Sequence, residues 1–134
     1  MTVREGGCLC GAVRYRIEAL PTDIAYCHCR MCQKASGAPA MAWATVPASA
    51  FAWTRGRPSP HRSSDHAGGF FCRECGSQLV FKVVSEPDRL DITVASLDDP
   101  TGVTPEYHIW TSSRLPWFDT TDQLPRYVEE REQG

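Results

Sequence analysis

Seven cysteines gathered in three short clusters constrain this chain of 134 residues more than any other feature of its sequence. An odd number of cysteines cannot be used up in disulfides alone, and thiols that stay reduced more often bind metals or carry out chemistry. We therefore interpret the clusters as groups of metal ligands. The clusters are Cys8-Leu-Cys10, Cys27-His-Cys29-Arg-Met-Cys32 and Cys72-Arg-Glu-Cys75.

The composition gives a physical reason for a bound metal. Leu, Ile, Val and Phe together supply only 25 of the 134 residues, which is a small share for a globular chain. The charged fraction of 22% is too moderate for a disordered protein. We therefore predict one small folded domain whose thin aliphatic core is supplemented by metal ligation.

Two classes of partner are disfavoured by the sequence. Residues 1–7 lack the apolar stretch of a secretory signal, and no segment approaches the roughly 18 apolar residues of a transmembrane helix. The 14 basic and 16 acidic residues are interspersed and give a net charge of −2, which offers no basic field for nucleic acid phosphates. We therefore expect a cytoplasmic protein that binds neither membranes nor nucleic acids.

Alternating apolar and polar residues predict a mainly β fold of several small antiparallel sheets. Strands are expected at 12–18, 77–84 and 89–95, with shorter strands at 24–27, 40–46, 69–71 and 108–111. The turn residues at 85–88 should join the second and third of these strands in a hairpin. One short helix is expected at 30–36, ending at Gly37, and a surface loop at 54–60.

The two clusters that contain two cysteines each predict one closed structural zinc site, because tetrahedral zinc takes four ligands. A glycine such as Gly76 allows the positive φ that a Cys-x-x-Cys turn often requires. The site would join segments about 60 residues apart, so we expect it to be needed for folding. Iron–sulfur ligation and redox-active thiols are the alternatives. The four ligands would be Cys8, Cys10, Cys72 and Cys75.

The remaining cluster, Cys27, Cys29 and Cys32, predicts a different kind of site. Three protein ligands and an open fourth position are typical of catalytic zinc. Three thiolates around Zn²⁺ leave a net charge of about −1, which weakens the ability of the metal to acidify water. We therefore expect the open position to receive the sulfur of a small thiol, held deprotonated near neutral pH.

Two other interpretations of this three-cysteine cluster stay open. It could be a redox-active thiol group, or a second structural site completed by a histidine. His28 lies between two of the cysteines, and adjacent side chains of an extended segment point to opposite faces, which disfavours it as a ligand of the same ion. The histidines of the chain are His28, His61, His66 and His108.

The order and spacing of the motifs resemble the glutathione-dependent formaldehyde-activating enzyme family, also called the centromere protein V/Gfa domain. The resemblance rests first on Gly7-Cys-Leu-Cys-Gly11, Cys27-His-Cys-Arg-Met-Cys-Gln33 and Phe71-Cys-Arg-Glu-Cys-Gly-Ser77. Further matches are Ala95-Ser-Leu-Asp-Asp-Pro100, Pro105-Glu-Tyr-His-Ile-Trp110, Pro116-Trp117 and Asp122-Gln-Leu-Pro-Arg-Tyr127. The matching segments predict a single domain over 5–127, followed by a tail at 128–134.

The resemblance implies a β-tent fold and two zinc ions per chain, with the same division of the seven cysteines into four structural and three catalytic ligands. It also implies the condensation of formaldehyde with glutathione to S-hydroxymethylglutathione, a reversible carbon–sulfur lyase reaction. The leading hypothesis is therefore a zinc-dependent carbon–sulfur lyase acting on a thiol–aldehyde adduct. The alternative is a non-catalytic zinc-binding module for protein interaction.

Thiolate attack on an aldehyde generates an alkoxide, so a proton donor near the open position would help. His28, Ser36, His66 and His108 are candidates, and we predict His108 as the catalytic one, although a hydrogen-bonded structural role is its alternative. Arg30 and Lys34 lie near the third cysteine ligand and could pair with the two carboxylates of glutathione. A solvated surface is the alternative for these two cations.

Overall fold

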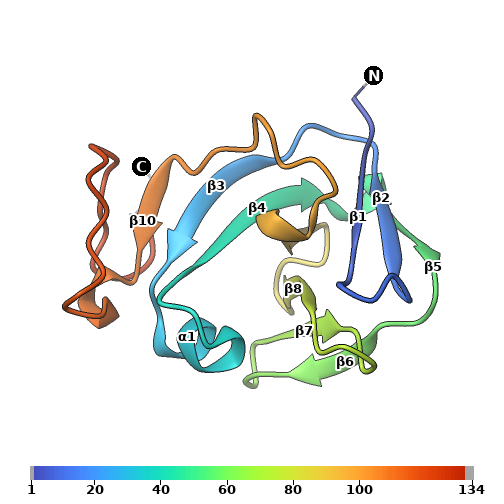
Figure 1. The fold of residues 1–134 in the computed structure, drawn as a ribbon, viewed down its shortest axis with the longest axis horizontal. Helices are drawn as coiled ribbons and strands as arrows, with labels where there is room; N and C mark the ends of the chain where they lie inside the picture. Colours follow the sequence, from blue (N-terminus) through green and yellow to red (C-terminus); the bar gives the residue numbers. More distant parts are fainter. Residues whose placement is uncertain (1, 132–134) are drawn as a thin grey trace.

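The computed structural model describes residues 2–131 and contains two β-sheets and one α-helix (Figure 1). Three short 3₁₀-helices lie at Ala48–Ala50, Val94–Ser96 and Thr111–Ser113. The α-helix, α1, spans Arg30–Ser36. The strands are β1 (Arg4–Gly7), β2 (Arg14–Ile17), β3 (Thr22–Cys27), β4 (Met41–Pro47), β5 (Phe51–Arg55), β6 (Ser59–Arg62), β7 (Ala67–Phe71), β8 (Gln78–Val83), β9 (Arg89–Thr93) and β10 (Tyr107–Ile109).

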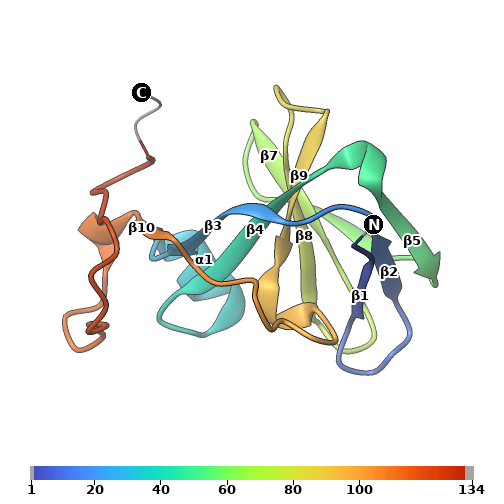
Figure 2. The ribbon, with the colours of Figure 1, turned by 90° about the horizontal axis from the view of Figure 1, so that it is seen from above.

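The smaller sheet has the strand order β1-β2-β5, and the larger has the order β10-β3-β4-β9-β8-β7-β6. All pairs are antiparallel except β10 with β3, which are parallel. The smaller sheet and the C-terminal segment lie at opposite ends of the molecule, with β3 and β4 running between them (Figures 1 and 2). The parallel pair places His108 beside Tyr26 and Ile109 beside Cys27.

The core lies where the inward residues of both sheets meet. In β2 the alternation expected of a half-buried strand is clear, because Tyr15 and Ile17 are fully buried while Arg16 is exposed. The buried Tyr15 hydroxyl lies 2.6 Å from the Ser96 hydroxyl, which satisfies both groups. Gly6 packs so closely here that a Cβ atom would approach the Ser96 carbonyl oxygen to 2.6 Å. Glycine at this position therefore allows β1 to approach the core.

The mainly β class with one short α-helix is confirmed. Helix α1 has the predicted bounds, and it ends at Gly37, which adopts a left-handed φ of 73°. The seven predicted strands are present with end shifts of one or two residues, and β8 pairs with β9 as the predicted hairpin. The expected loop at 54–60 is shorter, because β5 extends to Arg55 and β6 begins at Ser59. Strands β1, β5 and β6 were not predicted.

The domain limits at 5–127 remain a prediction, and residues 132–134 of the expected tail lie outside the described residues. The backbone of 128–129 accepts hydrogen bonds from Trp110 and Ser112, so this part of the chain packs against the segment after β10. Among residues 2–131, no helix combines the length and the apolar character that crossing a membrane would require.

Candidate metal centres

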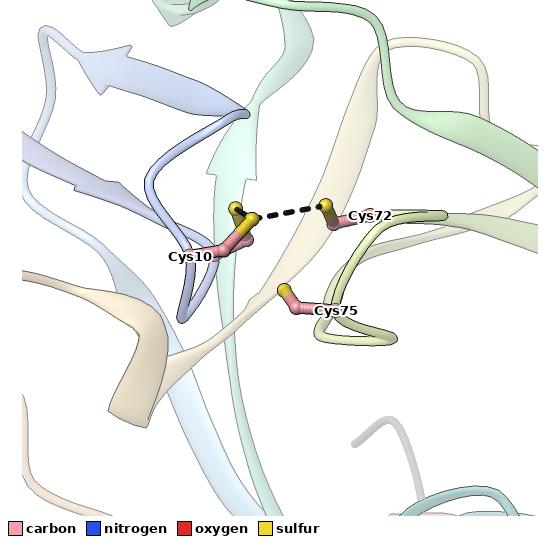
Figure 3. A group of neighbouring side chains, drawn as sticks. Cys10, Cys72 and Cys75 are labelled. Carbon is pink, nitrogen blue, oxygen red and sulfur yellow. Dashed lines mark hydrogen bonds between the residues drawn. The ribbon is translucent and has the colours of Figure 1, made fainter.

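Four cysteines from two distant turns converge on one point (Figure 3). Cys8 and Cys10 lie in the turn between β1 and β2, and Cys72 and Cys75 lie in the turn between β7 and β8. The four Sγ atoms all lie within 4.8 Å of one another, with 3.6 Å between Cys8 and Cys10 and 3.8 Å between Cys10 and Cys72. Tetrahedral zinc with Zn–S bonds of about 2.3 Å requires S–S separations of about 3.8 Å. The donor set therefore fits a zinc ion.

Hydrogen-bond donors beside Cys8 and Cys75 favour the thiolates of these two residues. The Val13 backbone N–H donates to Cys8 Sγ over 3.3 Å, and the Ser77 hydroxyl lies 3.1 Å from Cys75 Sγ. The Ser77 side chain, with the backbone amides of Ser77 and Cys10, lowers the pKa of Cys75 to about 5. The Ser77 hydroxyl oxygen also accepts the Leu9 N–H over 3.0 Å, which joins the two turns directly. These contacts hold the turns in position for a common ligand.

The second cluster, Cys27, Cys29 and Cys32, is built where β3 passes into α1. Cys27 is the last residue of β3, Cys29 is the N-cap of α1 and Cys32 lies in the first turn. The Cys32 backbone N–H donates to Cys29 Sγ over 3.3 Å, so the sulfur caps the helix. The three Sγ atoms lie within 4.8 Å of one another, and no other His, Cys, Asp or Glu in the described part of the chain joins this group. The cluster could therefore hold an ion through three protein ligands.

The thiols of this cluster cannot all ionise by themselves. Hydrogen bonds from the thiols of Cys27 and Cys32 lower the pKa of Cys29 to about 2. The pKa of Cys27 is raised far above its usual range, because its proton bridges to Cys29 and Cys32 and because its side chain is buried. One thiolate therefore forms readily, whereas the full set of three needs a cation to offset mutual repulsion. This chemistry fits a divalent soft metal ion.

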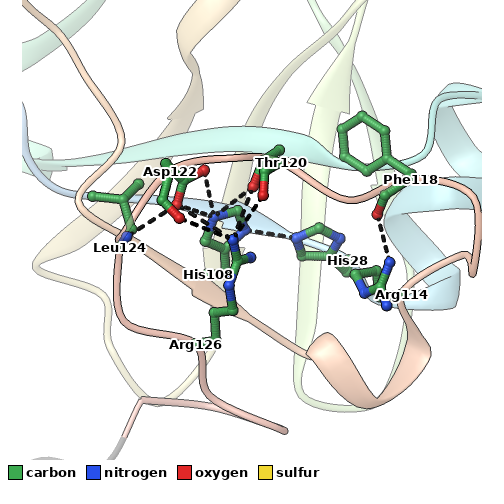
Figure 4. Close-up of polar contacts among 8 residues, drawn as sticks. All are labelled: His28, His108, Arg114, Phe118, Thr120, Asp122, Leu124 and Arg126. Atoms are coloured by element: carbon green, nitrogen blue, oxygen red, sulfur yellow. Dashed lines mark hydrogen bonds and ion pairs between the residues drawn. The ribbon is translucent and has the colours of Figure 1, made fainter.

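His28, between Cys27 and Cys29 in the sequence, begins a series of buried polar contacts (Figure 4). Its Nε2 lies 2.8 Å from Nδ1 of His108, and Nε2 of His108 lies 3.1 Å from Oδ1 and 3.2 Å from Oδ2 of Asp122. His28 and His108 are 1% and 0% exposed. Burial, followed by the positive charges nearby, lowers the pKa of His28. The sequence did not single out Asp122 as a functional residue, although it lies in one of the segments that carry the family resemblance.

Comparison with known protein families identifies the chain. The family model described as glutathione-dependent formaldehyde-activating enzyme matches residues 3–113, which include all seven cysteines. The chain belongs to this family. The division of the sulfur atoms into groups of four and three is therefore seen in a member of the glutathione-dependent formaldehyde-activating enzyme family.

Two relatives extend this finding. This member of the family is 31% identical to an uncharacterized lyase of Schizosaccharomyces pombe over 85 residues, which cover 58% of this chain and 56% of that protein. The match thus spans little more than half the length of the yeast protein. A crystal structure of a Rhodobacter sphaeroides protein is similar with a TM-score of 0.61 and 29% identity, covering 75% of this chain and 91% of that chain.

The other residues predicted for the site fall in different environments. Arg30 and Lys34 are exposed residues of α1, and together with Leu115 and Trp117 they line a groove of about 230 Å³. The Ser36 hydroxyl donates a hydrogen bond to the Cys32 carbonyl over 2.7 Å, which satisfies a backbone carbonyl near the end of α1. His66 is exposed in the turn between β6 and β7. Of the candidate proton donors, His28 and His108 are the two that the structure brings together.

Proposed function

We propose that this protein is a zinc-dependent carbon–sulfur lyase that forms and cleaves a thiol–aldehyde adduct such as S-hydroxymethylglutathione. The three-cysteine cluster carries the proposal, because its sulfur atoms lie within 4.8 Å of one another without a fourth protein ligand among residues 2–131. Zinc bound by Cys27, Cys29 and Cys32 would hold a substrate thiol deprotonated near neutral pH. The family membership and the lyase name of the yeast relative support the same reaction class.

The proposed reaction needs two proton transfers, one from the substrate thiol and one to the oxygen of the aldehyde. The substrate thiol gives up its proton, and its sulfur forms a bond to the aldehyde carbon while the π electrons of the carbonyl move to oxygen. The resulting alkoxide takes a proton and becomes the hydroxyl group of the adduct. In the reverse direction the hydroxyl loses this proton, the oxygen re-forms the carbonyl, and the electron pair of the broken C–S bond leaves on sulfur. The sulfur then regains a proton, and the thiol and the aldehyde are released. A hydrogen-bond donor beside the alkoxide would stabilise it, and the buried candidates are His28, which lies between Cys27 and Cys29 in the sequence, and His108, which contacts His28.

The groove beside α1 suits the peptide part of glutathione. Arg30 and Lys34 supply two positive charges on the helix that also carries Cys32, and glutathione carries two carboxylates. Arg30 donates to Gln33 Oε1 over 2.5 Å, and Gln33 also lines the groove. Trp117, 72% exposed, offers an apolar wall opposite these cations. We therefore assign this groove to the thiol substrate.

The function is tested by measuring exchange between free formaldehyde, glutathione and their adduct by NMR, with the zinc content of the protein determined first. The expected result is about two zinc ions per chain and exchange faster than the uncatalysed rate. Titration calorimetry with glutathione and with smaller thiols should show binding. Protein that is fully loaded with zinc, yet neither binds a thiol nor accelerates exchange, contradicts the proposal and favours a non-catalytic zinc-binding module for protein interaction.

Replacing Arg30 or Lys34 by Gln is expected to raise the KM for glutathione up to about fivefold each, with kcat little changed. Each substitution removes one exposed ion pair with the substrate, which contributes about 0.2–1 kcal/mol. The KM for 2-mercaptoethanol, which has no carboxylates, should stay the same. Arg73→Gln, an exposed cation between Cys72 and Cys75, is the matched control. Equal effects on both thiols would contradict this assignment of the groove.

A further inference from the structure

Asp122, His108 and His28 form a continuous series of hydrogen bonds that ends at His28, the residue between Cys27 and Cys29 in the sequence. The contacts of 2.8 Å between the two imidazole rings and of 3.1 and 3.2 Å to the carboxylate leave both nitrogens of His108 with partners. His28 Nδ1 is buried and has no hydrogen-bond partner among the described residues. The direction of this series follows from the chemistry of its two ends.

The Asp122 end can only accept hydrogen bonds. The Thr120 hydroxyl, the Leu124 backbone N–H and His108 together hold the pKa of the Asp122 carboxyl well below its usual range. An ionised carboxylate has no proton to donate. Nε2 of His108 must therefore carry a proton and donate it to Asp122, and in the neutral form of the ring Nδ1 is then the acceptor. His28 Nε2–H donates to that acceptor, so the proton of the neutral His28 ring is on Nε2.

The opposite arrangement, in which both imidazole rings carry their proton on Nδ1, is disfavoured at both ends of the series of hydrogen bonds. It would place the lone pair of His108 Nε2 3.1 and 3.2 Å from the oxygens of the Asp122 carboxylate, with the Thr120 hydroxyl, 3.3 Å away, left as its donor. It would also put a proton on His28 Nδ1, where this part of the chain offers no acceptor. A buried donor without an acceptor costs about 1–3 kcal/mol. The carboxylate thus fixes the tautomer of a ring two hydrogen bonds away.

His28 transmits this constraint to the cysteines, because its backbone joins Cys27 to Cys29. The His28 N–H donates to the Ile109 carbonyl over 3.1 Å, and the His28 carbonyl accepts from Gln33 Nε2 over 2.7 Å. With the ring contact to His108, the residue is held at three points by β10 and α1. Two of the three sulfur ligands sit on the peptides that His28 anchors.

We propose that His108 and Asp122 are positioning residues that fix the tautomer and orientation of His28, and through it the spacing of Cys27 and Cys29. Neither residue touches the substrate in this proposal, which rests on the proposed function for the role of the three-cysteine site. It assigns His108 a different part from direct proton transfer, because both of its ring nitrogens are already engaged and its side chain is 0% exposed.

Asp122→Asn is the informative substitution, because the amide has the same shape and the Asp122 side chain is 28% exposed, so the change should not unfold the protein. The Leu124 N–H, which donates to Oδ1 over 3.0 Å, should keep the amide oxygen at that place. The amide NH₂ then occupies the place of Oδ2, 3.2 Å from His108 Nε2, while the amide oxygen stays 3.1 Å away, so Nε2 meets both a donor and an acceptor and neither tautomer is excluded. An Asn in place of a tautomer-fixing Asp can reverse the tautomer of the neighbouring imidazole while leaving its geometry intact. We therefore expect the opposite arrangement to become populated.

The test is ¹⁵N NMR of the imidazole rings in zinc-loaded protein. In the wild type, His28 and His108 should each show one tautomer with the proton on Nε2. In Asp122→Asn a second population with the proton on Nδ1 should appear in both rings. Asp65→Asn, which removes an exposed carboxylate before β7, is the matched control and should leave the spectra unchanged. A wild type with the opposite tautomers, or a variant identical to the wild type, overturns the proposal.

Zinc transfer to a chelator tests whether the tautomer matters for the cysteines. The kinetic phase that is lost in Cys29→Ser belongs to the three-cysteine site. In Asp122→Asn this phase should be faster by about 10-fold or more, as expected when an outer partner of a metal site is lost, and the other phase unchanged. If the tautomers of His28 and His108 change in Asp122→Asn but the rate of zinc release from the three-cysteine site does not, the positioning role is overturned. A wild type that binds no ion at the three cysteines refutes the proposed function instead, and the NMR measurement still decides whether Asp122 fixes His28.

Discussion

Cys72→Ser is expected to unfold the protein in buffer without denaturant, which is the largest effect of any single substitution considered. Cys72 is 1% exposed and belongs to the four-cysteine cluster that joins the β1–β2 turn to the β7–β8 turn. Structural zinc contributes an apparent binding free energy of about 10–16 kcal/mol, whereas a domain is stable by only about 5–15 kcal/mol. A serine hydroxyl is a poor replacement for a thiolate ligand of zinc. Circular dichroism and the zinc content of the purified variant measure the result.

Two controls make this expectation specific to the metal. A strong chelator should unfold the wild type and leave the Cys72→Ser spectrum unchanged. Ser77→Ala removes the hydroxyl that lies 3.1 Å from Cys75 Sγ and accepts the Leu9 N–H, but it keeps all four sulfur atoms. It should lower the free energy of unfolding by about 0.5–1.5 kcal/mol per lost hydrogen bond and leave the fold intact. A folded Cys72→Ser protein with a full complement of zinc would show that these four cysteines are not a structural site.

Local patterns in the sequence predict those elements of the structure that depend only on residues close together in the chain. The bounds of α1 follow from a cap at Cys29 and a left-handed residue at Gly37, both of which act within one turn of the helix. The alternation of β2 and the turn between β8 and β9 are equally local. Strands β1 and β6 gave no such signal, because one contains two glycines and the other contains Pro60 in a short polar segment.

The candidate site also has a part that the sequence predicts and a part that it does not. The grouping of the sulfur atoms follows from the spacing of the cysteines and the ligand number of zinc, and the structure brings together the same groups of four and three. The contact of His28 with His108 depends instead on a parallel pairing between β3 and β10, strands that are separated by 80 residues of sequence. A pairing of that kind cannot be derived from either strand alone. Asp122, from an irregular segment, had no pattern that would place it beside His108.

Cys29→Ser should have the opposite consequence to Cys72→Ser, with loss of activity and retention of the fold. The side chain of Cys29 caps α1 by accepting the Cys32 N–H, and serine is among the preferred residues at an N-cap. The helix should therefore keep its first turn while the site loses one of its three sulfur ligands. The expected protein contains about one zinc ion, melts within a few degrees of the wild type and has kcat reduced by at least about a thousandfold, because several kcal/mol of transition-state stabilisation leave with the metal.

Met31→Ser is the matched control for this substitution, because Met31 is an exposed residue of the same helix turn and its side chain is not a ligand. It should keep both ions and wild-type activity. Loss of one ion in Cys29→Ser together with unchanged exchange of formaldehyde and glutathione would place the reaction outside the three-cysteine site. Retention of both ions would mean that Cys29 is not a ligand, and the division of the seven cysteines between fold and chemistry would then be wrong.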